Sequence, residues 1–147
     1  MMQVVVRSGT IEEAILIQEQ IPEFENGYTA AEYTNRLLGG ESVILIAEIA
    51  GKLAGFKVGY DRFLDGKVFY SWMGGVVPAF RGQGVAKILL QKMEVWCKLK
   101  GYRSLKFKTR NSHRSMIHFA IHQGFNVVDF EPQPNPDDSK IYFSKEL

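Results

Sequence analysis

The chain has 147 residues, a length that suits one domain with a hydrophobic core of its own. Hydrophobic residues make up 46% of the chain and charged residues 23%, which excludes a disordered protein, and a single cysteine excludes an internal disulfide. No apolar run approaches membrane-spanning length, and the N-terminus lacks a basic segment followed by an apolar block, so we expect a cytoplasmic protein without a membrane partner.

The net charge of +2 hides an uneven distribution of charges. Residues 1–50 carry eight acidic and two basic side chains, whereas residues 98–114 carry seven basic and no acidic ones. The first segment is expected to suit a cation and the second a polyanion. Nucleic-acid binding is one reading of the basic run, but the low total charge and only two aromatic residues there, Tyr102 and Phe107, are too little for base stacking. We therefore expect no nucleic-acid partner.

The most informative stretch is Tyr70 to Leu90, YSWMGGVVPAFRGQGVAKILL. Its first half is β-branched and aromatic and predicts a strand, with a bulge or a close backbone approach at Gly74 and Gly75. Its second half has an apolar stripe and predicts a long helix that begins near Gly84. A helix N-terminus carries free N–H groups and a partial positive charge, so this loop, which also contains Arg81, is predicted to bind an anion such as a phosphate.

The remaining strands and helices are indicated by caps, turns and periodicity. Thr10 with Glu13 and Thr29 with Glu32 form two capping-box patterns, Ala50-Gly51 predicts a hairpin turn, and Asn111-Ser112 offers a cap for the last helix. In chain order we predict a strand at 3–7, helices at 10–20 and 29–39, strands at 42–49 and 52–61, the strand and long helix of the stretch above, a strand at 104–108, a helix at 111–123, and strands at 125–131 and 140–146.

The hexapeptide Arg81-x-x-Gly84-x-Ala86, placed between a strand and an amphipathic helix, resembles the acetyl-CoA signature of the GNAT superfamily of acyl-CoA N-acyltransferases. The order of elements is similar to that of the family, and so are the hairpin at 47–59 and the Gly-Phe pair after the last helix. The resemblance covers nearly the whole chain. It implies an α/β fold of the α+β type, in which residues 1–147 form a single GNAT domain with a mixed, mostly antiparallel sheet of about seven strands and about four helices, in the order β-α-α-β-β-β-α-β-α-β-β.

The same resemblance implies acetyl-CoA as co-substrate. Backbone N–H groups from Gln83 to Ala86 would hold the pyrophosphate beside Arg81, and the pantetheine amides would pair with the preceding strand like an additional strand. Asn111 could contact pantetheine or could instead be a helix N-cap. The cofactor-binding residues that the resemblance implies are Gly75, Val76, Val77, Arg81, Gly82, Gln83, Gly84, Val85, Ala86, Asn111, Ser115 and Phe119.

The implied activity is transfer of an acetyl group to a primary amine, of a small molecule or a protein, by direct attack in a ternary complex. The sequence departs from the family pattern at Ala120, where many members carry the tyrosine that protonates the thiolate, and the start of the central strand lacks the usual carboxylate. Our substitutes are Glu23 and Glu25 as bases in an acidic, aromatic rim. The candidate proton donors near the missing tyrosine are Ser115, His118 and His122, and solvent is the alternative because a CoA thiol is acidic. Because usual groups are missing, a non-catalytic acyl-CoA-binding or sensing domain is the alternative.

The three histidines do not predict a metal site. His118 and His122 are four residues apart and would share a helix face, but no third ligand accompanies them. We therefore expect no metal. The family resemblance allows a homodimer, and the sequence leaves the oligomeric state open.

Overall fold

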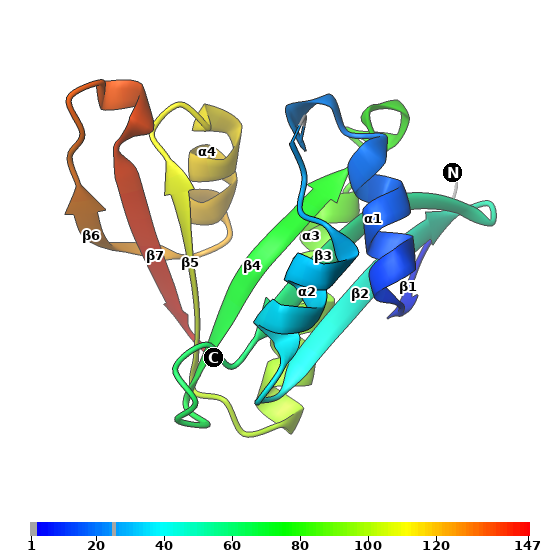
Figure 1. Ribbon diagram of the computed structural model, residues 1–147, viewed down its shortest axis with the longest axis horizontal. Helices are drawn as coiled ribbons and strands as arrows, with labels where there is room; N and C mark the ends of the chain where they lie inside the picture. Colours follow the sequence, from blue (N-terminus) through cyan, green and yellow to red (C-terminus); the bar gives the residue numbers. More distant parts are fainter. Residues whose placement is uncertain (1–2, 25) are drawn as a thin grey trace.

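The computed structural model describes residues 3–24 and 26–147. In these residues seven strands form one sheet in the order β1-β2-β3-β4-β5-β7-β6 (Figure 1). The β4–β5 pair is parallel and the other pairs are antiparallel. The predicted α+β architecture and the predicted order of elements are thereby confirmed. The strands are β1 (Val4–Ser8), β2 (Ser42–Ile49), β3 (Lys52–Tyr60), β4 (Val68–Val76), β5 (Ser104–Arg110), β6 (Asn126–Glu131) and β7 (Lys140–Glu146), and the helices are α1 (Ile11–Glu19), α2 (Ala30–Leu37), α3 (Val85–Leu99) and α4 (Arg114–His122).

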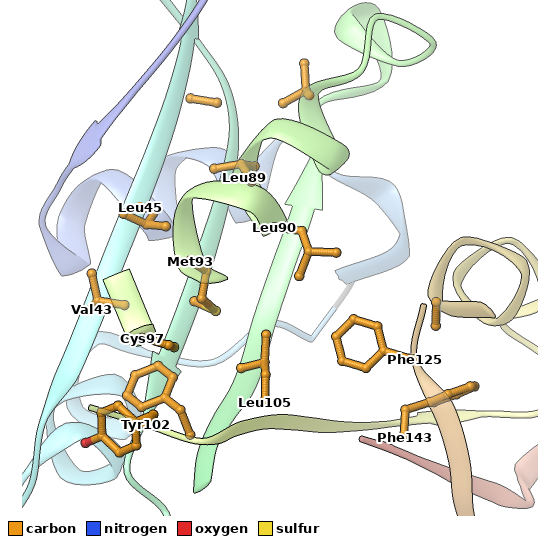
Figure 2. Close-up of a cluster of buried hydrophobic side chains, with 14 of the residues drawn as sticks. Val43, Leu45, Leu89, Leu90, Met93, Cys97, Tyr102, Leu105, Phe125 and Phe143 are labelled. Atoms are coloured by element: carbon orange, nitrogen blue, oxygen red, sulfur yellow. The ribbon is translucent and has the colours of Figure 1, made fainter. Parts of the chain in front are cut away.

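Helices cover both faces of the sheet. Side chains of α1 and α2 pack with Phe56 and Val58 of β3 on one face. On the other face α3 lies against β2, β3 and β4, and Figure 2 shows Leu89 and Met93 of this helix pointing toward those strands. Side chains alternate along a strand, so one strand can supply a core to each helix layer. Cys97 is fully buried in the α3 layer, and burial raises the pKa of its thiol to about 12, which makes it a core residue.

The predicted N-caps are confirmed for α1 and α2 but not for α4. In α1, the Thr10 side chain accepts the Glu13 N–H and the Glu13 side chain accepts the Thr10 N–H, and α2 begins with the same box. The predicted cap at Asn111-Ser112 is wrong: α4 follows His113, which gives no side-chain cap. The reason is tertiary, because the N–H groups of Asn111 and Ser112 donate to carbonyls of the loop between β6 and β7.

Strands β4 and β5 pair over three residues and then diverge (Figure 1). The pairs join residues 68–70 to residues 104–106; beyond them β4 continues beside β3, and β5 beside β7. The ladder between β3 and β4 skips Trp72, so the bulge lies there, and of the two alternatives predicted at Gly74 and Gly75 the bulge is not the one observed. Gly75 does show a close approach, because a Cβ there would lie 2.7 Å from Ile21 Cδ1 of the loop after α1. Within the described residues, the divergence leaves this edge of β4 without a strand partner beyond Tyr70.

A charged cluster joins β1, β2 and the start of α1. Arg7 of β1 hydrogen-bonds Glu13 of α1, and its Nε donates to Glu48 of β2 over 2.5 Å. The hydrogen bond from Arg7 holds the pKa of Glu13 down at about 2. All three side chains are only partly exposed, so solvent screens the cluster less than an open surface pair.

Glu13→Gln tests the contribution of this cluster, since glutamine keeps the capping hydrogen bond and removes the charge. A folded-state pKa below the ordinary value stabilises the fold above about pH 4.5, and this stabilisation is lost as the pH falls toward 2. We expect the variant to lose about 1–2 kcal/mol in the free energy of unfolding at pH 7, measured by urea unfolding. The difference should vanish near pH 2; an equal difference at both pH values would contradict the assigned cause.

Candidate functional site

The divergence of β4 and β5 opens a cavity of about 990 Å³. One wall is β4 from Ser71 to Val76, and the opposite wall is the end of β5 with α4. The start of α3 and the loop before it close one end. A cleft of this size with a few polar groups is the usual form of a small-molecule site.

The start of α3 presents unused hydrogen-bond donors to the cavity. Gly84 is the N-cap, its φ of +79° lies in the left-handed region that favours glycine, and it gives no side-chain cap. Within the described chain, no atom accepts a hydrogen bond from the backbone N–H groups of residues 82–87. Gly82, Gly84, Val85 and Ala86 line the cavity, whereas the exposed Gln83 does not. This end of the cavity can bind an anion.

Arg81 lies at the same end and is bound to Glu23. The two side chains are 3.0 Å apart from Nη2 to Oε2, and the Nε of Arg81 donates to the Val76 carbonyl over 3.1 Å. The hydrogen bond from Arg81 lowers the pKa of Glu23. Both side chains line the cavity. Glu25, the second predicted base, lies outside the described residues.

The backbone N–H and carbonyl groups that β4 directs to the cavity differ from those predicted from the sequence. The Val77 N–H donates to Ala54 O, at 2.8 Å, and is therefore not free for a ligand, which corrects its predicted role. Since backbone groups alternate in direction along a strand, Gly75 also points toward β3, and Gly74 and Val76 point toward the open edge. The contact of the Val76 carbonyl with Arg81 agrees with this direction. Gly74 could not be predicted as a ligand-facing residue, because the direction of its backbone groups depends on the register of β4 with β3.

Helix α4 brings two of the predicted residues to the cavity, whereas a third, in the turn before α4, lies outside it. Ser115 and Phe119 line it, together with Ala120, which is fully buried. Asn111 does not line the cavity; its N–H donates to Ser139 O and its carbonyl accepts from Arg114 Nε. The loop position of Asn111 is thus explained by backbone contacts.

No metal site is evident in residues 3–24 and 26–147, where no three His, Cys, Asp or Glu side chains come together. His118 and His122 are both exposed on α4. No helix of the described chain is both long and apolar enough to cross a membrane.

Lys57 lines the cavity from β3, and it was not singled out from the sequence. Its side chain forms no hydrogen bond or ion pair with the other described residues. Burial lowers its pKa to about 8, although the negative charge of Glu94 acts in the opposite direction. The sequence feature that could have indicated Lys57 is its position as the one lysine inside the otherwise apolar segment Leu53 to Tyr60.

Lys57→Met is expected to stabilise the protein. A lysine whose pKa is lowered from 10.5 to about 8 reduces the free energy of unfolding at pH 7. This loss of stability shrinks as the pH rises from about 8 to 10.5, because the lysine then loses its proton in the folded state before it does in the unfolded state. We expect a gain of about 1–3 kcal/mol at pH 7, measured by urea unfolding, that shrinks toward pH 10.5. Lys52→Met, at the exposed start of the same strand, is the control. A gain that does not depend on pH would contradict this account.

Several solved structures that this fold resembles are acetyltransferases. The chain superposes on the ribosomal-protein-S18-alanine N-acetyltransferase from Escherichia coli with a TM-score of 0.83 and 16% identity, over 99% of this chain and 94% of that one. Ard1 from Thermoplasma volcanium superposes with a TM-score of 0.81 and 16% identity, over 98% of this chain and 97% of that one. A GNAT family acetyltransferase from Elizabethkingia anophelis with acetyl-CoA bound superposes with a TM-score of 0.73 and 18% identity, over 98% of both chains. At these identities the likeness shows the fold alone.

The sequence itself carries the family assignment. No curated protein sequence matches the chain. The family model of the acetyltransferase (GNAT) family matches residues 13–125, which include the strand β4, the Arg81 loop and the helix α3 that build the cavity. The chain therefore belongs to the acetyltransferase (GNAT) family.

Proposed function

We propose that the protein is an acetyl-CoA-dependent N-acetyltransferase that acetylates a primary amine. The observation that carries the proposal is the cavity at the β4–β5 divergence, which ends at unused N–H groups of residues 82–87. A doubly charged pyrophosphate gains from several converging donors and from the partial positive charge of the helix start. Membership of the GNAT family supports acyl-CoA-dependent acetyl transfer in general.

The open edge of β4 supports the placement of the pantetheine arm. Gly74 and Val76 direct N–H and carbonyl groups to that edge, where an extended amide chain can pair with them. An N–H of this edge would also donate to the thioester oxygen, where negative charge develops. Ser115 and Phe119 would face the arm from α4.

The reaction that fits this arrangement is direct attack of the amine on the thioester carbonyl. A carbon–nitrogen bond forms, the carbon–sulfur bond breaks, the amine loses a proton and the CoA thiolate gains one. We propose the Ser115 hydroxyl, relaying a proton from water, as the donor to the thiolate, since Ala120 has no proton to give.

Glu23 fits a different role from the base that the sequence suggested. Its contact with Arg81 places it at the end of the cavity proposed for the pyrophosphate, and that contact lowers the pKa of Glu23, which weakens it as a base. We propose that Glu23 forms an ion pair with Arg81 until the pyrophosphate of the donor displaces the carboxylate.

Gly84→Glu tests the donor site. Among the described residues, no atom outside the neighbouring residues lies within 4 Å of a Cβ at Gly84, so the variant has room for its side chain. Its carboxylate would lie near the N–H groups proposed for the pyrophosphate and repel it. We expect calorimetry to show no binding of acetyl-CoA to this variant. Gly84→Ala is the control, because it adds the same strain at positive φ without the charge and should keep most of the affinity. Unchanged affinity of Gly84→Glu would overturn the donor site.

Glu23→Gln separates a base from a competitor for Arg81. Without the carboxylate, Arg81 is free and a negative charge is removed from the donor site, so acetyl-CoA should bind about two- to fivefold more tightly. The kcat should stay within about twofold of the wild-type value. A loss of kcat by about a hundredfold or more would instead identify Glu23 as the base.

A non-catalytic acyl-CoA-binding domain is the second candidate. The absence of a tyrosine at Ala120 and of a carboxylate at the start of β4 favours it. Release of CoA from acetyl-CoA across a panel of amines decides between the two: binding without release would support the non-catalytic domain.

A further inference from the structure

A second, smaller cavity of about 240 Å³ adjoins the large one. The two share Tyr28, Trp72, Met73 and Lys108 in their linings, so a molecule in one can extend into the other past the bulge at Trp72. The small cavity is further lined by Tyr70 and by two arginines, Arg36 and Arg62. The α3 start, with its donors for an anion, is not part of it.

Three cations from three elements converge on the small cavity: Arg36 of α2, Arg62 of the loop between β3 and β4, and Lys108 of β5. The Arg36 Cζ lies 4.7 Å from the centroid of the Trp72 ring, and the Arg62 Cζ lies 4.8 Å from that of Tyr70. Aromatic faces therefore hold both guanidinium groups and leave their N–H edges available to a ligand.

These cations lack a neutralising partner in the part of the chain that the structure describes. None of the three forms an ion pair there, in contrast to Arg7 and Arg81. The carboxylate that acts on Lys108 is that of Glu131, which accepts a hydrogen bond from the Tyr142 hydroxyl. Burial lowers the pKa of Lys108, and repulsion from Arg62, Lys140 and Arg36 lowers it further. Excess positive charge is thus concentrated at this cavity.

We propose that the small cavity binds an oxyanion of the acceptor, so that the acceptor is a small amine that also carries a carboxylate or a phosphate. Arginine forks match both groups, and the shared lining at Trp72 lets the amine of the same molecule reach the large cavity. This inference rests on the proposed acetyltransferase function and names its substrate class. It replaces the expected acidic rim for a cation, because Tyr28 lies beside Arg36 in this cavity.

Matched pairs of amines test the proposal with the full-length protein. Glycine is compared with glycinamide, 4-aminobutyrate with 4-aminobutyramide, and O-phosphoethanolamine with ethanolamine, by release of CoA from acetyl-CoA. We expect an anionic amine to exceed its neutral partner by about tenfold or more in kcat/KM, as loss of a charged hydrogen-bonding partner predicts. Preference within the first two pairs identifies a carboxylate, and preference within the third a phosphate. Equal use of both members in every pair overturns the proposal and leaves the acetyltransferase function standing.

Arg36→Gln and Arg62→Gln locate the preference. Each should raise KM for the anionic amine by about tenfold and change KM for its neutral partner far less, because only the anion uses the guanidinium group. Lys52→Gln removes one positive charge at an exposed site outside both cavities and is the control. Thermal unfolding checks that each variant is folded. A preference that survives in both arginine variants overturns the assignment to this cavity.

Calorimetry separates failure of this proposal from failure of the proposed function. The protein is saturated with CoA, which needs no turnover, and titrated with each pair of amines. Tighter binding of the anionic member supports the anion site even if no acetyl group is transferred, in which case the transferase function fails alone. Equal binding of both members, or binding of neither, overturns the anion site.

Discussion

The short pairing of β4 with β5 is the constraint on which the rest of the structure depends. A parallel pair of strands would normally continue, but β5 beyond Lys106 keeps its pairing with β7 while β4 stays with β3. Unsatisfied backbone groups in a closed interior are costly, so the exposed edge of β4 is stable only because a cavity open to solvent or ligand lies beside it. The helix that follows β4 then starts at the end of this cavity, which places its free N–H groups there.

The charges around the two cavities divide the site by function. At the α3 start, the positive charge of Arg81 is matched by Glu23, an exposed pair that a more strongly charged ligand can displace. Around the small cavity, Arg36, Arg62 and Lys108 remain unmatched among the described residues. A donor that carries its own phosphates and an acceptor that carries its own oxyanion would therefore be held at separate ends, with the reacting groups between them.

Local chemistry made much of the fold predictable, and long-range contacts account for the rest. The capping boxes of α1 and α2, the Ala50-Gly51 turn and the start of α3 each depend on neighbouring residues, so the sequence could indicate them. The contact of Arg81 with Glu23 spans 58 positions, and the small cavity joins residues from α2, the β3–β4 loop and β5. Periodicity carries no information on such pairs. The edge of β4 toward which a backbone group points also depends on the register of β4 with β3.

The bulge at Trp72 explains how one strand can serve both cavities. An extra residue in a strand reverses the alternation beyond it, so β4 presents a different set of groups before and after Trp72. Two tyrosines pack against the indole of Trp72, whose ring centroid lies 4.9 Å from those of Tyr28 and Tyr33. The Tyr33 hydroxyl in turn donates to Gln18 of α1. Packing of α1 and α2 thus helps to position a side chain that lines both cavities, and a shift of these helices would change the passage between donor and acceptor.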